Sequence, residues 1–171
     1  AFQRDRLAAV VGRSGSGRSA LLLTLAGRMR GWTGSVQVAG YDAATQTRLL
    51  RDRSSVARIS DLVDLEPRLT IAESITERAL IDGMQIARAG SRFDASCERL
   101  GVVFDRAKLV GELSALDQTR LAVALATMRP AEVVFLDEAR RGLDAEQFTS
   151  LLAGLVRLVD AQGEDLVVVR R

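Results

Sequence analysis

The sequence predicts an α/β fold with a mainly parallel β-sheet flanked by helices. Strand-sized apolar runs alternate with longer helical patterns, and this alternation is typical of a parallel sheet with helices on its faces. The expected strands are Leu7–Val11, Val36–Ala39, Val56–Ser60, Val133–Leu136 and Leu166–Val169, and the expected helices are Ala20–Arg28, Ile71–Ile86, Ala115–Met128 and Ala145–Val159. The stretch from Leu69 to Met128 has no strand pattern, so we expect a helical subdomain at residues 69–128, inserted into a discontinuous core at residues 1–68 and 129–171.

The composition restricts the class of protein. With 171 residues the chain is large enough for one domain with its own core. Lys108 is the only lysine among 24 basic residues, the net charge is +2, and the basic residues do not cluster with aromatic ones, so we expect no nucleic-acid partner. Cys97 is the single cysteine and histidine is absent, which excludes an internal disulfide and gives no pattern for a zinc site. The apolar runs are too short for a transmembrane helix or a secretory signal, so we expect a cytoplasmic chain.

The glycine-rich segment Gly12–Ser19, with the sequence G-R-S-G-S-G-R-S, lies between the first predicted strand and the first predicted helix. It matches the P-loop pattern G-x-x-x-x-G-K-[ST], except that Arg18 replaces the lysine. Gly12, Gly15 and Gly17 permit a backbone whose N–H groups turn toward phosphate oxygens, and the helix that follows adds its positive end. A loop of this composition can be only a turn, but the full pattern in this context favours a nucleotide site.

The predicted site has an altered cation. The residues expected to bind the nucleotide are Gly12, Arg13, Ser14, Gly15, Ser16, Gly17, Arg18, Ser19 and Ala20. The Ser19 hydroxyl is placed to ligate Mg²⁺. Arginine at position 18 keeps the positive charge of lysine but brings a wide planar group to a crowded phosphate. Since this chain uses arginine almost everywhere, the exchange at this position also fits simple compositional drift.

Two acidic residues, Asp137 and Glu138, follow the predicted strand Val133–Leu136 directly. This is the Walker B form, and a buried strand brings such acids to its C-terminal edge, where ligands bind in open α/β sheets. We predict that Asp137 orients Mg²⁺, directly or through water, and that Glu138 is the general base for an attacking water. A strand ending in solvated acids is the alternative, but the preceding P-loop favours catalysis and a P-loop NTPase fold.

The order of these motifs resembles the nucleotide-binding domain of ATP-binding cassette (ABC) transporters over nearly the whole chain. The similar segments are Gly34–Gly40 after the P-loop helix, Leu65–Ser74 after the Q-loop, Leu113-Ser114 at the start of the L-S-G-G-Q signature, and Gly142–Asp144 at the D-loop. The resemblance implies MgATP binding, a head-to-tail dimer with a second nucleotide-binding domain, and a transmembrane partner at the inner face of the cell membrane. The family's upstream strand with its adenine-stacking aromatic has no counterpart here, so we expect a core truncated at both ends.

Several positions depart from the family pattern. Counting back from Pro67, Asp61 stands at the Q-loop glutamine, where its carboxylate is still expected near Mg²⁺ or water. Arg171 stands at or next to the switch histidine. Ala139 replaces the proline that usually follows the Walker B glutamate.

The signature itself reads L-S-A-L-D, with Ala115 and Leu116 in place of two glycines and Asp117 in place of the glutamine. The resemblance gives Ser114 to Asp117, with Asp144 of the D-loop, as contacts to the second nucleotide-binding domain. Leu116 adds bulk there and Asp117 adds a charge of the same sign as phosphate. Because Ser114-x-x-Asp117 is also an acceptable helix cap, we expect a helix start that has lost much of its phosphate-sensing role.

The sequence thus indicates an ATP-binding subunit or domain of an ABC-type transporter with slow or impaired hydrolysis. The alternative is a degenerate, non-hydrolysing cassette that serves as the structural or regulatory partner of an active ATPase chain, in a homodimer or a heterodimer. An ABC ATPase of the DNA-repair type fits less well, because the chain lacks the long coiled-coil or zinc insertions of that class.

Overall fold

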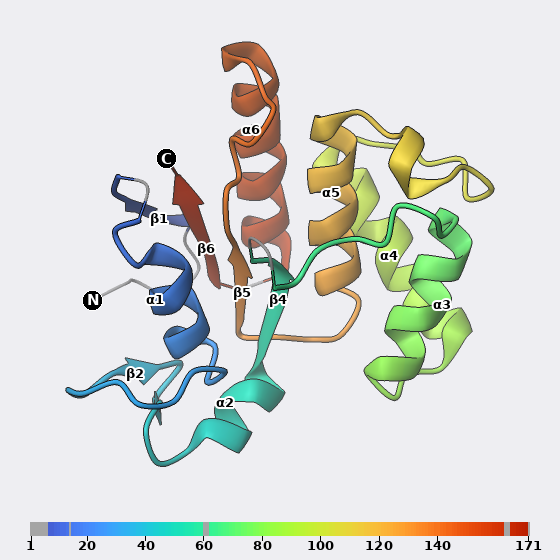
Figure 1. Ribbon diagram of the computed structural model, residues 1–171. Coiled ribbons are helices and arrows are strands. Elements are labelled where there is room, and N and C mark those ends of the chain that lie inside the picture. Colours follow the sequence, from blue (N-terminus) through green and yellow to red (C-terminus); the bar gives the residue numbers. More distant parts are fainter. Residues whose placement is uncertain (1–6, 14, 60–61, 163–164, 171) are drawn as a thin grey trace.

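The computed structural model describes residues 7–13, 15–59, 62–162 and 165–170. Its centre is a four-stranded sheet with the order β1-β6-β5-β4, and every neighbouring pair is parallel (Figure 1). The strands are β1 (Leu7–Val11), β4 (Ser54–Arg58), β5 (Val133–Leu136) and β6 (Asp165–Arg170). The mainly parallel sheet is therefore confirmed. Strand β6 lies between β1 and β5 and is parallel to both. The loops after β1 and β5 therefore leave the sheet at the same edge, where the strands have their C-terminal ends.

Side chains on β5 alternate between the two faces of the sheet. Val133 and Phe135 belong to an apolar cluster with Leu22 and Leu25 of helix α1 (Arg18–Leu25). Val134 and Leu136 belong to a second cluster, which includes residues of α5 (Ala115–Ala126) and α6 (Ala145–Gln162). A strand that buries both faces reads as a continuous apolar run, which explains why β5 has no polar alternation in the sequence.

A short hairpin replaces one strand that the sequence predicts. The expected strand Val36–Ala39 is only β2 (Gln37–Val38), which pairs antiparallel with β3 (Tyr41–Asp42) in a separate two-stranded sheet. Ala39 and Gly40 have φ angles of 51° and 82°, and two consecutive residues with positive φ form the tight turn that joins hairpin strands. The prediction of a strand through Ala39 was therefore wrong.

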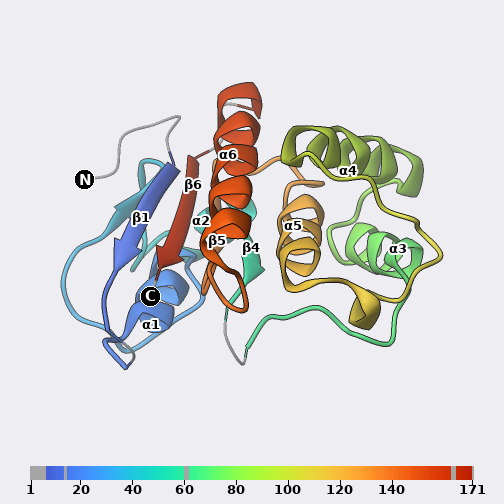
Figure 2. The ribbon, with the colours of Figure 1, turned by 90° about the horizontal axis from the view of Figure 1, so that it is seen from above.

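The elements between Leu69 and Met128 are helices, grouped beside the sheet on the side away from β1 (Figure 2). They are α3 (Ile71–Ile81), α4 (Ile86–Leu100), the 3-10 turn η1 (Val110–Glu112) and α5. The helical character of this stretch agrees with the sequence, while its division from the core remains a prediction. In the described part of the chain, no helix combines the length and apolar character needed to cross a bilayer.

The expected single helix Ile71–Ile86 is wrong. Helix α3 ends at Ile81 because Gly83 adopts a φ of 65° and reverses the chain. The N–H of Met84 then donates to the carbonyl of Ala79 at 2.8 Å, a bond typical of a glycine-terminated helix. Two further helices, α4 and the short α2 (Thr47–Arg53), were not predicted.

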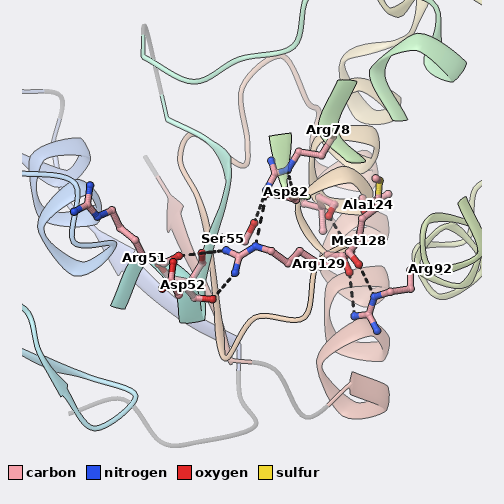
Figure 3. A network of polar contacts seen from close by, with 12 residues as sticks. Arg51, Asp52, Ser55, Arg78, Asp82, Arg92, Ala124, Met128 and Arg129 are labelled. Carbon is pink, nitrogen blue, oxygen red and sulfur yellow. Dashed lines mark hydrogen bonds and ion pairs between the residues drawn. The ribbon is translucent and has the colours of Figure 1, made fainter. Parts of the chain in front are cut away.

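An ion-pair network joins the helical group to the start of β4 (Figure 3). The Asp82 carboxylate after α3 accepts from Arg78 Nε at 2.6 Å and lies 3.6 Å from Arg129 Nε. Arg129 also donates to the carbonyl of Ser54 at 2.7 Å, and Arg78 donates to Ser55 Oγ at 2.8 Å. Asp82 thus compensates two half-buried arginines that tie α3 and the end of α5 to the sheet.

The Asp82→Asn substitution is expected to lower the free energy of unfolding by about 2 kcal/mol, because two largely buried guanidinium groups lose their counter-charge. Urea unfolding followed by circular dichroism measures the change. Asp94→Asn is the control: Asp94 also lies 2.6 Å from an arginine, Arg106, but the two side chains are 64% and 45% exposed. Its loss is expected to be below about 1 kcal/mol, and equal losses would contradict the prediction.

Candidate nucleotide-binding site

The glycine-rich loop between β1 and α1 has the backbone that its sequence predicts. Gly15 and Gly17 have φ angles of 76° and 78°, in the left-handed region that strains residues with a Cβ. A Cβ on Gly12 would lie 2.8 Å from Ser16 Oγ, so a side chain there would displace this hydroxyl. The N–H of Ser16 donates to the carbonyl of Arg13 at 3.2 Å and closes the turn. The predicted binding residue Ser14 lies outside the described residues.

Arg18 is the first residue of α1, two residues before the predicted helix start at Ala20. Its side chain is half-buried, and its Cδ lies 3.5 Å from the position that a Cβ on Gly12 would take. The stem of Arg18 therefore lies back against the loop. Ala20, two residues further along the helix, is also half-buried, whereas Arg13 is exposed.

The structure brings together two residues predicted to hold the metal. Ser19, in the first turn of α1, donates a hydrogen bond of 2.5 Å from its Oγ to Oδ2 of Asp137, which follows β5 and lies 118 residues away in the sequence. Asp137 is only 2% exposed, and its Oδ1 accepts the N–H of Glu138 at 2.8 Å. The third predicted metal residue, Asp61, lies outside the described residues.

A hydroxyl and a carboxylate oxygen at one point suit Mg²⁺, which is commonly held by one or two protein oxygens, substrate phosphates and water. Among the described residues no group of three or more His, Cys, Asp or Glu side chains encloses a metal by itself. The donor set of Ser19 and Asp137 therefore fits a metal that arrives with a phosphate ligand, and does not fit a resident all-protein metal site.

Glu138, the predicted general base, has an unusual backbone. Its φ is 49°, which is rare for a residue with a side chain and is found preferentially at functional sites. Its carbonyl accepts from Nη2 of Arg58 at 3.3 Å, and the same nitrogen donates to Thr119 Oγ1 on α5 at 3.1 Å. The backbone around the Walker B acids is thus connected to the helix that follows the signature.

Arg58, at the end of β4, was missed by the sequence reasoning. It is 5% exposed, and burial lowers its pKa from the ordinary value, although the nearby carboxylates, first Asp64 and then Glu138 and Asp137, act in the opposite direction. The sequence signal is an arginine at the end of a strand of otherwise small, uncharged residues. A second missed residue, Arg141, forms ion pairs with Glu138 and Asp64.

The signature segment, which differs from the family pattern, forms a helix cap. Ser114 Oγ accepts the N–H of Asp117 at 3.1 Å and donates to the Asp117 carboxylate at 3.0 Å, which confirms the predicted helix start. The other carboxylate oxygen of Asp117 lies 3.4 Å from Arg120 Nη1. Leu116 is half-buried and packs against the apolar cluster of the helices, and Ala115 lies close to the turn at Gly142. Asp117 is therefore engaged within its own helix.

Asp144 caps α6 in the same way. Its carboxylate accepts the N–H of Gln147 at 2.8 Å, and Gln147 Oε1 accepts the N–H of Asp144 at 3.1 Å. Its predicted contact with a second nucleotide-binding domain stays a prediction, as do those of Ser114 to Asp117. Arg171, at the switch position, lies outside the described residues.

The parallel sheet, the glycine loop and the Ser19–Asp137 contact define a P-loop NTPase fold. Residues 1–141 match a family model described as ABC transporter, and this chain therefore belongs to the ABC transporter family.

Among curated proteins, the chain is 31% identical over 157 residues to the ribose import ATP-binding protein RbsA 2 of Rubrobacter xylanophilus, covering 87% of this chain and 30% of that protein. It is 27% identical over 170 residues to the uncharacterized ABC transporter ATP-binding protein Rv0986 of Mycobacterium tuberculosis, covering 98% of this chain and 68% of that one. The chain covers 41% of the methionine import ATP-binding protein MetN 2 of Burkholderia mallei, at 28% identity over 162 residues and 94% of this chain. The chain thus spans between about a third and two thirds of these relatives.

A solved structure of cbiO1 from Clostridium perfringens superimposes with a TM-score of 0.80, covering 99% of this chain and 68% of that chain. The sequence identity is 19%, so this likeness supports the fold.

The Ser114→Ala substitution is expected to lower the free energy of unfolding by about 1 kcal/mol, because it removes the oxygen that caps α5. Ser91→Ala is the matched control, since Ser91 is exposed inside α4 and its Oγ donates only to the Ala87 carbonyl. That change is expected within about 0.5 kcal/mol. Unchanged stability of the Ser114 variant in urea unfolding would contradict the capping role.

Proposed function

We propose that this chain is an ATP-binding domain of an ABC-type transporter, which holds MgATP at residues 12–20 and hydrolyses it slowly. The observation that supports this most is the 2.5 Å hydrogen bond between Ser19 and Asp137, which brings the two expected Mg²⁺ ligands to one point at the end of the loop. The names of the relatives, which are ATP-binding proteins of transporters, agree with this role.

The loop and its helix would hold the phosphates of ATP. Backbone N–H groups of the loop and the N-terminus of α1 suit the phosphate oxygens, and the Arg18 stem, which lies against Gly12, would bring its positive charge to the same place. Mg²⁺, when bound, neutralises part of the phosphate charge. Ser19 and Asp137 would hold this ion, and the burial of Asp137 fixes where its carboxylate lies.

Glu138 would act on the attacking water. In this role its carboxylate accepts a proton from water as the water oxygen bonds to the γ-phosphorus and the bond to the ADP oxygen breaks, giving ADP and phosphate. We infer slow turnover for two reasons. Arg18 brings a planar group where a compact ammonium suits the phosphate nest better, and Glu138 is paired with Arg141 at 3.7 Å.

The partners are part of the same proposal. We propose that the chain lies at the inner face of the membrane through a transmembrane subunit and pairs with a second nucleotide-binding domain. The cbiO1 structure is described as part of the ABC transporter complex cbiONQ. In the head-to-tail dimer implied by the resemblance, each nucleotide site combines the P-loop of one domain with the signature of the other. With an intact partner domain, one site would therefore contain Arg18 and the other would contain the L-S-A-L-D signature. The degenerate, non-hydrolysing cassette stays the alternative.

Calorimetric titration with MgATP, with phosphate release followed in the same sample, tests the proposal. Binding with slow but measurable phosphate release would support it. Binding without any release would favour the degenerate cassette. Absence of binding would overturn the proposed function.

Arg18→Lys is expected to tighten MgATP binding by about fivefold, close to 1 kcal/mol, because the compact ammonium fits the phosphate nest better. Titration calorimetry gives the Kd. Arg48→Lys is the control, since Arg48 is exposed on α2, outside the loop, and its Kd should not change. Equal or weaker affinity in the Arg18 variant would reject the idea that the arginine impairs the site.

Glu138→Gln is expected to change phosphate release by less than about threefold, because the base already contributes little in a restrained site. In an efficient site, the loss of one catalytic group costs about 100-fold or more. Phosphate release at saturating MgATP measures the effect. A fall of more than about tenfold would show that Glu138 is a fully active base.

A further inference from the structure

We propose that Arg141 is a positioning residue that holds the Glu138 carboxylate and thereby restrains hydrolysis at this site. The inference rests on the proposed function and deepens it, since it names what regulates the general base. The motif resemblance assigns no role to Arg141.

The contact places one cation between two acids. Arg141 Nη1 lies 3.7 Å from Glu138 Oε2 and 3.9 Å from Asp64 Oδ2. The Glu138 side chain is 13% exposed, whereas those of Arg141 and Asp64 are 57% and 50% exposed. The guanidinium therefore lies at the solvent side of a nearly buried carboxylate.

A closed turn fixes this pair. The N–H of Arg141 donates to the carbonyl of Glu138 at 2.8 Å, and positive φ angles at Glu138 (49°) and Gly142 (72°) bend the chain on either side. A Cβ on Gly142 would lie 3.1 Å from Ala115 Cβ, so the turn also packs against the start of α5. Because the turn already sets the spacing of the two residues, no further backbone entropy is lost when their side chains pair.

A second arginine holds the other end of Glu138. Arg58 Nη2 donates to the Glu138 carbonyl at 3.3 Å and to Thr119 Oγ1 at 3.1 Å, and its side chain is buried. The backbone of Glu138 is thus fixed from the core side, while Arg141 binds its carboxylate from the solvent side. Rotation of the carboxylate toward an attacking water requires the contact with Arg141 to open.

Asp64 connects this pair to the segment after β4. Ile59 and Val63 exchange two backbone hydrogen bonds of 2.9 Å each, and this bridge fixes the chain just before Asp64. By the family resemblance this is the Q-loop segment. Displacement of this segment would remove one of the two acids that hold Arg141 in place.

The chemical consequence concerns orientation. A general base must present a carboxylate oxygen to the attacking water within hydrogen-bond distance. The guanidinium of Arg141, 3.7 Å from Glu138 Oε2, attracts this oxygen electrostatically and holds the carboxylate turned toward the cation. Arg141 therefore keeps Glu138 in an unproductive orientation, and its removal should release the base without altering the phosphate loop.

The test compares Arg141→Ser with Arg140→Ser in the full chain. Arg140 is the adjacent arginine, and its guanidinium lies 5.8 Å from the centre of the Phe148 ring, so it is matched in charge and sequence position. We expect Arg141→Ser to raise kcat for phosphate release at least about fivefold with an unchanged KM for MgATP. Arg140→Ser and the conservative Arg141→Lys are expected to stay within about twofold of the original chain.

The Arg141→Ser, Glu138→Gln double variant is expected to lose the gain, which a merely structural effect of Arg141 would not produce. An absent rise, an equal rise in Arg140→Ser, or a rise that survives Glu138→Gln would overturn the inference. If calorimetry shows MgATP binding but kcat does not rise, the inference fails while the proposed function stands.

If MgATP does not bind to any variant, the proposed function fails and the contact is tested without nucleotide. The urea midpoints of Arg141→Ser, Glu138→Gln and the double variant then form a cycle. Non-additive shifts are expected for an ion pair. Additive shifts would overturn the inference.

Discussion

The hydrogen bond from Ser19 to Asp137 connects the two parts of the chain on which the proposed nucleotide site depends. A carboxylate that is 2% exposed is stable only when its oxygens have partners. One oxygen of Asp137 accepts from the hydroxyl of Ser19 and the other from the N–H of Glu138. The contact with Ser19 requires the loops after β1 and β5 to leave the sheet at one edge, and they do so because both strands run parallel to β6. The core of the sheet thus determines where a phosphate and its metal would lie.

Arginine makes most of the long-range side-chain hydrogen bonds and ion pairs among the described residues. Arg129 and Arg78 join the helices to the start of β4, at the end of the sheet away from the loop, and Arg58 and Arg141 contact Glu138. A guanidinium has five N–H donors, so one side chain binds a carbonyl, a hydroxyl and a carboxylate together. In a chain with a single lysine, this property holds the helical group and the sheet in a fixed relation.

This rigidity has a functional meaning in the proposed transporter domain. The helix after the signature contacts the backbone of Glu138 through Arg58 and Thr119, so movement of the helical group would reach the proposed general base. At the start of that helix, Ser114 and Asp117 form hydrogen bonds with each other. A domain of this kind is suited to bind nucleotide and transmit movement while turnover is restrained.

The sequence alone determined the features that depend on neighbouring residues. The glycine loop, strand β5 and the helix start at Ser114 follow from local backbone preferences, burial and capping, and all three are present. Local patterns did not identify the helix break at Gly83, because a continuous apolar periodicity conceals it. Only the tertiary structure decided which groups surround Glu138, since Arg58 reaches it from 80 residues away through the order of the strands. Contacts of this kind depend on sheet topology, which no short segment encodes.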